Sequence, residues 1–331
     1  MGRRCLHVIP PVHHRALCPI PETIHDPVVL RHKTQEGVRC SRRLCDVPVL
    51  IPENLAELRE AACSHDPVLL AGGTDLMVAL NHRSQRIESD STVVSLARVP
   101  ELRSWSHDPT SGELTIGSGI TWSQLERAPF DALAPALAQA ARTVGSPQIR
   151  NAGTIGGNIA TASPAGDGLP VLLALDATVD SVGSDGERST PLSELLTGTK
   201  RTSLAPGEVI VAVRFKVDDG WQGYAKIGVR NAMVISVAGV ALVLDGTARR
   251  ARIALGSVGP TVLLAGQASA FLTSEFDWDA WTCSEATIAT VAEMAAQESR
   301  PIDDHRSTAE YRRHGVRVLT SRLLKRGRER R

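Results

Sequence analysis

The sequence predicts an α+β chain of two domains, and three observations support this prediction. The length of 331 residues is about twice that of a typical domain, and 42% of the residues are apolar, which is enough for a core in each. Strand and helix patterns alternate over residues 46–219, whereas strands come first and helices follow over residues 222–326. The boundary is predicted near residues 218–221, at the sequence DDGW.

Residues 1–45 differ in composition from the rest, with four of the six cysteines and half of the ten histidines. Cys40 and Cys45 have the C-x4-C spacing that opens a plant-type iron–sulfur motif, but the C-x-x-C continuation is absent. We therefore expect this segment to be a disordered extension or the product of a misplaced translation start, and not a metal site.

The first domain begins with a predicted helix at 52–64, where Pro52 suits the first turn and Leu55, Leu58 and Ala61 recur at helical spacing. We assign no helix or strand to the glycine- and serine-rich segment 144–168. The other expected helices are 74–82, 121–127, 132–143 and 170–175, and the expected strands are 67–71, 92–97, 113–118, 176–182 and 208–215.

The second domain is predicted to start with consecutive antiparallel strands, because apolar runs are separated by short polar turns. Helices then cluster at the end, and Ser284 is a suitable N-cap for the middle one. The expected strands are 224–230, 233–244 and 253–259, and the expected helices are 262–272, 284–298 and 308–325.

Charge, hydropathy and cysteine spacing exclude several classes of protein. Lys+Arg 37 against Asp+Glu 36 gives a net charge of +1, so nucleic acid is not the expected partner. The longest apolar run, Val234–Leu244, is too short by roughly half to span a membrane. The cysteines lack zinc spacing, and scattered thiols in a chain of this length favour a reducing compartment, so we predict a cytoplasmic protein without a metal site.

Two glycine-rich segments carry the functional information. In the first, Leu69–Leu76 (LLAGGTDL), a buried strand delivers Gly72 and Gly73 to the start of a helix. Glycine permits a close approach by a ligand, and amides at such a position suit a phosphate. In the second, residues 151–167 combine the pair Gly156–Gly157 with hydroxyls and one carboxylate, which suits a pyrophosphate and a sugar.

Taken alone, each segment is equally compatible with an ordinary turn. Neither the dinucleotide fingerprint G-x-G-x-x-G nor the phosphate loop G-x-x-x-x-G-K-[ST] occurs in the chain. If a nucleotide binds, it therefore binds in another way.

The motifs AGGTDL, TIGGN, TASPAGD and LLALDA resemble those of the FAD-binding medium subunits of molybdenum hydroxylases, the xanthine dehydrogenase and carbon monoxide dehydrogenase family. The similarity continues through GEVIVAVRF, YAKIGVRNAMVISVAGVAL and PIDDHRSTAEYRRH in the family's order, and it covers about 47–325. Xanthine dehydrogenase-type subunits look most similar. The resemblance implies a vanillyl-alcohol-oxidase (PCMH) type FAD-binding domain of two subdomains at 46–219 and a C-terminal α+β domain at 222–326.

The resemblance also implies a set of FAD-binding residues. The first segment would lie along the pyrophosphate, with the amides of Gly72, Gly73 and Thr74 as donors, and the second would face it. Asp167 would bond the sugar hydroxyls, Ile210 would pack on an aromatic ring, and Lys226 would reach the flavin. The full set is Leu69, Leu70, Ala71, Gly72, Gly73, Thr74, Asp75, Leu76, Thr154, Gly156, Gly157, Asn158, Thr161, Asp167, Ile210 and Lys226.

Some of these residues have a plain structural interpretation as well. Leu69, Leu70 and Ile210 suit the core of any fold, Asp167 could be only a helix N-cap, and Lys226 lies in a predicted strand where a lysine is usually solvated. Their roles as ligands therefore depend on the resemblance.

The family implies a division of labour between subunits. A large subunit carries molybdopterin, a small subunit carries two [2Fe-2S] clusters, and the FAD of this chain passes electrons to NAD+ or oxygen. No side chain here need act as an acid or base, so no catalytic residue is predicted. The alternatives are a stand-alone flavoprotein oxidase, disfavoured because neither glycine loop carries a His or Cys for covalent attachment, and a scaffold subunit that has lost FAD, disfavoured by the intact glycines.

Overall fold

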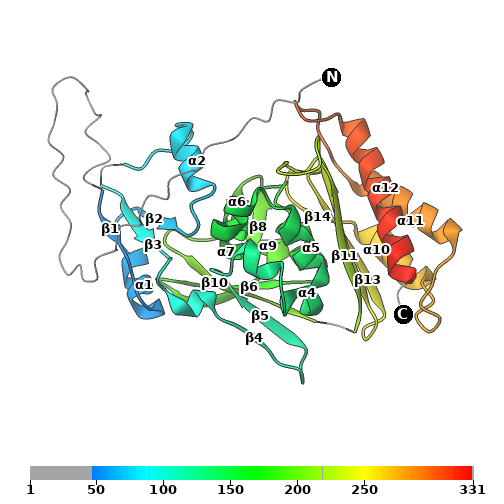
Figure 1. Cartoon of the computed structure of the whole chain (residues 1–331), viewed down its shortest axis with the longest axis horizontal. Helices are drawn as coiled ribbons and strands as arrows, with labels where there is room; N and C mark the ends of the chain where they lie inside the picture. Colours follow the sequence, from blue (N-terminus) through cyan, green and yellow to red (C-terminus); the bar gives the residue numbers. More distant parts are fainter. Residues whose placement is uncertain (1–46, 89, 218, 330–331) are drawn as a thin grey trace, which may run out of the picture. The chain divides into compact units, whose positions relative to one another are not determined.

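A computed structural model describes residues 47–88, 90–217 and 219–329 (Figure 1). The expectation for residues 1–45 therefore lies outside the described part. These described residues belong to one compact unit, which contains three larger sheets, their helices and one two-stranded sheet.

The first sheet is small and parallel. Its strands lie in the order β1 (Val49–Leu50), β3 (Thr92–Ser95) and β2 (Pro67–Leu70). Helix α1 (Leu55–Ala62) packs on it through three buried residues. The predicted start at residue 52 was wrong by three residues, because the side chain of Asn54 accepts the amide of Glu57 and caps the helix.

The second sheet has five antiparallel strands, and its central strand is the buried β10. The order is β4 (Trp105–His107), β5 (Glu113–Gly117), β10 (Val209–Lys216), β6 (Thr178–Gly183) and β7 (Gly186–Pro191). The two edge strands, β4 and β7, were not predicted. Both are mostly exposed, so they lack the apolar pattern by which a strand is recognised.

The segment 144–168, which was expected to lack regular structure, contains helices α6 (Pro147–Ala152) and α7 (Ile155–Thr161). Ser146 caps α6 by accepting the amide of Ile149, and Thr154 caps α7 by accepting the amide of Gly157. These helices were not predicted because glycine has a low helix propensity. They depend on caps and tertiary packing more than on intrinsic helix propensity.

The remaining elements of this half connect or cover the two sheets. Helix α5 was expected to begin at 132, but the chain there forms two separate helices, α4 and α5. These elements are α2 (Leu76–Asn81), η1 (Pro100–Arg103), α3 (Trp122–Leu125), α4 (Phe130–Leu133), α5 (Pro135–Thr143), α8 (Gly168–Ala174), α9 (Leu192–Leu195), β8 (Leu196–Gly198) and β9 (Arg201–Thr202).

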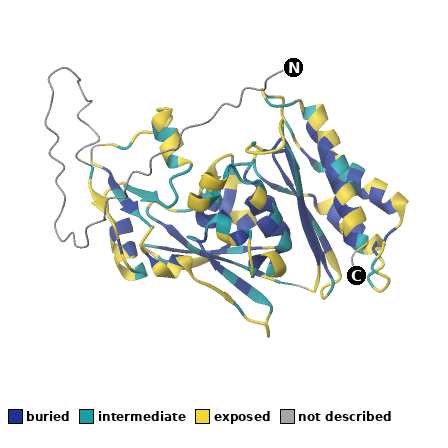
Figure 2. Cartoon of the chain, in the orientation of Figure 1, coloured by how far each residue is buried: buried dark blue, intermediate teal, exposed yellow. Residues whose placement is uncertain are grey.

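The third sheet opens the C-terminal part and is antiparallel. Its strands lie in the order β11 (Gly220–Ile227), β12 (Ala238–Asp245), β13 (Arg250–Gly256) and β14 (Leu263–Leu264). Strand β12 is buried throughout, as Figure 2 shows by its colour. Strand β11 begins at Gly220, within the predicted boundary of 218–221, and the division into domains stays a prediction.

Three helices cover one face of this sheet, as predicted from the order of elements (Figure 1). They are α10 (Gly266–Glu275), α11 (Glu285–Glu298) and α12 (Ala309–Arg328). The predicted N-cap is confirmed, because the Ser284 hydroxyl accepts the amide of Thr287 at 3.0 Å. Helices α5 and α8 contact strands of the same sheet, so its edge and inner face meet the preceding half of the chain.

No helix in the described part of the chain is long and apolar enough to cross a membrane.

Candidate functional site

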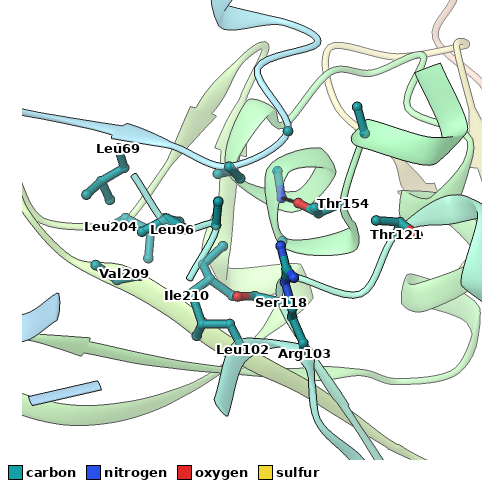
Figure 3. Close-up of a pocket in the computed structure, with 18 of the residues that line it drawn as sticks. Leu69, Leu96, Leu102, Arg103, Ser118, Thr121, Thr154, Leu204, Val209 and Ile210 are labelled. Atoms are coloured by element: carbon teal, nitrogen blue, oxygen red, sulfur yellow. Dashed lines mark hydrogen bonds between the residues drawn. The ribbon is translucent and has the colours of Figure 1, made fainter. Parts of the chain in front are cut away.

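The two glycine-rich segments lie side by side and line one cavity of about 260 Å³ (Figure 3). The loops that follow β2, β3 and β5 supply much of its wall, together with η1, helices α6 and α7 and the start of β10. Seven of the predicted FAD-binding residues line it, namely Leu69, Ala71, Gly72, Thr154, Gly156, Gly157 and Ile210. Segments that are 80 residues apart in the sequence therefore converge as the prediction requires.

Packing explains both glycines of the first segment. A Cβ on Gly72 would lie 1.8 Å from the carbonyl oxygen of Ala152, so only glycine allows the two segments to touch. Gly73 has a φ of +68°, which glycine adopts without strain. The glycine pair thus turns the chain out of β2 and brings its backbone against the second segment.

This turn leaves a run of main-chain donors without acceptors. Among the described residues, no acceptor pairs with the amide N–H of Gly72, Gly73, Thr74 or Asp75. Unpaired amides are costly unless water or a ligand accepts from them. Successive amides of this kind suit an anion such as a diphosphate.

The second segment contains two glycines with different surroundings. A Cβ on Gly156 would lie 2.5 Å from the Cβ of Ser118, and the Gly156 amide donates to the Ser118 carbonyl at 2.9 Å. A Cβ on Gly157 would meet only the Thr154 hydroxyl, at 3.1 Å. Gly156 is therefore required by packing, whereas Gly157 keeps space open in the cavity.

One end of the cavity is apolar. Ile210 is 6% exposed and lies among leucine and valine side chains that come from β2, the end of β3 and the start of β10 (Figure 3). These side chains are Leu69, Leu96, Leu102, Leu204 and Val209. The combination of unpaired amides and an apolar end fits a nucleotide, whose diphosphate needs donors and whose ring needs apolar surface.

Asp167 and Lys226 do not line this cavity and instead bind each other. The Lys226 ammonium donates to Asp167 Oδ2 at 2.6 Å, to the Thr143 carbonyl at 2.9 Å and to the Val234 carbonyl at 3.1 Å. Both charged side chains are more than 90% buried. All three donors of the ammonium are thus used, and the pair joins helix α8 to strand β11.

Tyr224 completes this buried cluster by donating its hydroxyl to Asp167 Oδ1 at 2.9 Å. Burial raises the pKa of the Asp167 carboxyl above its ordinary value, although Lys226 and the hydrogen bonds act in the opposite direction. Burial and the nearby carboxylate raise the pKa of the Tyr224 phenol well above its ordinary value. The phenol therefore remains a hydrogen-bond donor at neutral pH.

The capping role considered for Asp167 is not found, because its side chain makes no bond to the amides of α8. Seven predicted residues neither line the cavity nor belong to this cluster: Leu70, Gly73, Thr74, Asp75, Leu76, Asn158 and Thr161. Asn158 Oδ1 is buried without a partner among the described residues. Thr161 and Asp75 lie together, with their side-chain oxygens 3.3 Å apart.

Sequence reasoning missed five polar residues that line the cavity: Arg103, Ser118, Thr121, Asn151 and Glu208. Arg103 ends the short helix η1, and Ser118 and Thr121 follow strand β5, so no local pattern distinguishes these three from surface residues. Their position was available only from the pairing of β5 with β4 and β10.

Comparison with protein families decides the class of this site. Residues 43–215 match the FAD binding domain in molybdopterin dehydrogenase, and residues 224–326 match the CO dehydrogenase flavoprotein C-terminal domain. The chain belongs to the FAD-binding medium subunits of the molybdenum hydroxylases. The predicted family, fold class and oxidoreductase role are therefore confirmed.

Relatives of this medium subunit carry different names. It is 32% identical to the carbon monoxide dehydrogenase medium chain of Hydrogenophaga pseudoflava, over 78% of this chain and 88% of that one. It is 29% identical to the putative xanthine dehydrogenase FAD-binding subunit of Escherichia coli K12, over 77% and 87%. The 6-hydroxypseudooxynicotine dehydrogenase complex subunit alpha of Paenarthrobacter nicotinovorans is 34% identical, over 78% and 86%.

Solved structures agree with this assignment. Carbon monoxide dehydrogenase from H. pseudoflava, lacking the Mo-pyranopterin moiety, has a TM-score of 0.76 at 28% identity, over 85% of this medium subunit and 96% of the solved chain. Quinoline 2-oxidoreductase from Pseudomonas putida 86 has a TM-score of 0.76 at 26% identity, over 86% and 97%. The PCMH-type fold with a C-terminal α+β part is thus the fold of this chain.

Proposed function

We propose that this medium subunit binds FAD in the cavity between its glycine-rich segments, receives electrons from [2Fe-2S] clusters of a small partner subunit and passes them to NAD+ or oxygen. A large partner subunit with molybdopterin would hydroxylate the substrate. The observation that carries the proposal is the run of unpaired amides at residues 72–75 beside an apolar end of the cavity.

The residues of this chain would bind and orient the cofactor without exchanging protons with it. The amides of Gly72, Gly73 and Thr74 would hold the diphosphate from one side, and the start of α7 at Gly157 would face them. Ile210 and the leucines around it would exclude water from a ring. When bound, FAD supplies the capacity to take up and release an electron pair.

Asp167 and Lys226 remain proposed cofactor contacts. In the described structure they satisfy each other. For Lys226 to reach the flavin, one of its three present acceptors would have to be replaced by a flavin oxygen. For Asp167 to bond a sugar hydroxyl, it would use a lone pair not taken by Tyr224 or Lys226.

We propose a xanthine dehydrogenase-type assembly, and the similarity to the E. coli subunit supports this. Relatives of comparable identity are named for carbon monoxide and for a nicotine derivative. We therefore assign the choice of substrate to the large partner subunit. A cytoplasmic location is proposed from the scattered cysteines, which suit a reducing compartment.

The test is the visible spectrum of the purified full chain, recorded alone and after assembly with its partner subunits. We expect flavin absorption that acid releases as free FAD, because no His or Cys stands at either glycine loop for covalent attachment. A protein that is colourless even in the assembled complex would refute FAD binding. Flavin that stays attached after acid treatment would favour the stand-alone oxidase instead.

A further inference from the structure

Two charged side chains line the cavity, and only one of them is free to act on a ligand. Glu208 is paired with Arg188, whose Nη2 and Nε donate to its two carboxylate oxygens at 2.8 and 3.0 Å. The Glu208 carboxylate also accepts the amide of Ala205 at 2.7 Å. Its charge is therefore already compensated within the protein.

Arg103 is the other charged residue of the lining, and it is the only Arg or Lys there. Among the described residues, no carboxylate and no carbonyl accepts a hydrogen bond from its guanidinium. Figure 3 shows the side chain extending into the cavity toward Thr154. A permanently charged group with five unused donors thus points into a cavity that already presents unpaired amides.

The backbone around Arg103 is held firmly, although its side chain is exposed. Leu102 is fully buried, and its carbonyl accepts the amide of Gly119 at 2.7 Å. The carbonyl of Ser104 accepts the amide of Gly117 at 2.8 Å. Hydrogen bonds on both sides of Arg103 therefore fix its Cα to the end of strand β5. As a result, little backbone conformational freedom remains to be lost when a ligand binds.

We infer that Arg103 is an FAD-binding residue that pairs with the diphosphate of the ADP half. This inference rests on the proposed binding of FAD. The diphosphate carries negative charge, and the predicted binding set contains one cation, Lys226, which is already paired with Asp167. A guanidinium forms a planar fork that matches phosphate oxygens, and it loses less entropy per bond than a lysine would.

The experiment measures the FAD dissociation constant of the full apo chain by flavin fluorescence, for wild type, Arg103→Gln and Arg103→Lys. Arg98→Gln is the matched control, because Arg98 is a nearby exposed arginine that pairs with Glu53 outside the cavity. We expect Arg103→Gln to raise the dissociation constant about tenfold or more, Arg103→Lys to raise it less, and Arg98→Gln to change it less than twofold.

A second measurement locates the contact. ADP is used to displace FAD, and its affinity should fall by the same factor as that of FAD in Arg103→Gln. An unchanged FAD affinity in Arg103→Gln would overturn the inference, and so would an ADP affinity that does not fall. We expect Arg103→Gln and wild type to have equal melting temperatures, because no described residue forms a hydrogen bond or an ion pair with the exposed Arg103 side chain.

The failure of this inference and the failure of the proposed function give different results. If wild type itself binds no FAD, the proposed function is wrong. If wild type binds FAD and Arg103→Gln binds it equally well, the proposed function stands and only the role of Arg103 is refuted.

Discussion

The cavity between the glycine-rich segments and the Asp167–Lys226 cluster differ in how their polar groups are paired. Gly72 brings an unpaired main-chain amide to the cavity and Arg103 brings an unpaired guanidinium, so these donors have no acceptor among the described residues. In the cluster, each charge is buried and already has a partner within 3.2 Å. The first region therefore has donors available to a ligand, whereas the second joins helix α8, the end of α5 and strand β11.

The largest effect is expected from breaking the cluster with Lys226→Met. Removing one member leaves a buried carboxylate without compensation, so the free energy of unfolding should fall by about 3–5 kcal/mol. Urea denaturation of the full chain measures this. The double variant Lys226→Met with Asp167→Leu removes both charges and should recover most of the loss. If the single variant is as stable as wild type, the cluster does not hold these elements together.

The loss should also depend on pH. The folded-state pKa of Asp167 lies above its unfolded value, so stability from this group is present below the unfolded pKa and is lost as pH rises through the folded one. Lys226 lowers that pKa, so its removal raises the pKa of Asp167 further. Lys226→Met should therefore cost more at pH 8 than at pH 5, and an equal cost at both would contradict this account.

The next effect concerns the cavity and is expected from Gly157→Val. Because only the Thr154 hydroxyl lies near a Cβ at this position, at 3.1 Å, the new side chain would displace that hydroxyl slightly and extend into the cavity. We expect the affinity for FAD to fall by about 100-fold or more, measured by flavin fluorescence. Gly266→Val is the control, since a Cβ there meets nothing within 4 Å, and it should retain FAD. Unchanged flavin content in Gly157→Val would refute this placement of FAD.

The smallest effect is expected from Tyr224→Phe, which removes one hydrogen bond from Asp167 and keeps the ring. The free energy of unfolding should fall by about 1 kcal/mol. Tyr311→Phe, at an exposed tyrosine, should change it by less than about 0.5 kcal/mol. The FAD dissociation constant of Tyr224→Phe sharpens the comparison. A several-fold increase in this constant would indicate that the cluster contributes to FAD binding, and an unchanged constant would indicate that it does not.

Elements with strong local signals were predictable from sequence. Strand β2 and the cap of α11 at Ser284 were correct, because an apolar run and a capping hydroxyl are local features. The helices α6 and α7 were missed, because their glycine and proline content gave no helical pattern; caps stabilise both, together with contacts of α6 with α3 and of α7 with β10. The edge strands β4 and β7 were missed for want of apolar residues.

The candidate site was also predictable only in part, because only some of its residues belong to a local sequence motif. The glycine pairs were found because they carry a motif, and the structure brings Gly72 and Gly157 to one cavity. The pairing of Asp167 with Lys226 spans 59 residues and has no local signature. Arg103 belongs to a short 3₁₀ helix in which an arginine is ordinarily a surface residue, so its place in the cavity follows from tertiary structure alone.

The unpaired donors at residues 72–75 belong to the main chain, which has a consequence for mutational mapping. Replacing Thr74 or Asp75 by alanine leaves every one of these N–H groups in place, so alanine substitutions at these two positions should have little effect on binding. Binding should weaken instead where a larger side chain is introduced into this segment, or where one of its main-chain amides is replaced by an ester. A map of the substitutions that this medium subunit tolerates would therefore identify the binding site by positions that do not accept a larger side chain, and not by positions that require a particular side chain.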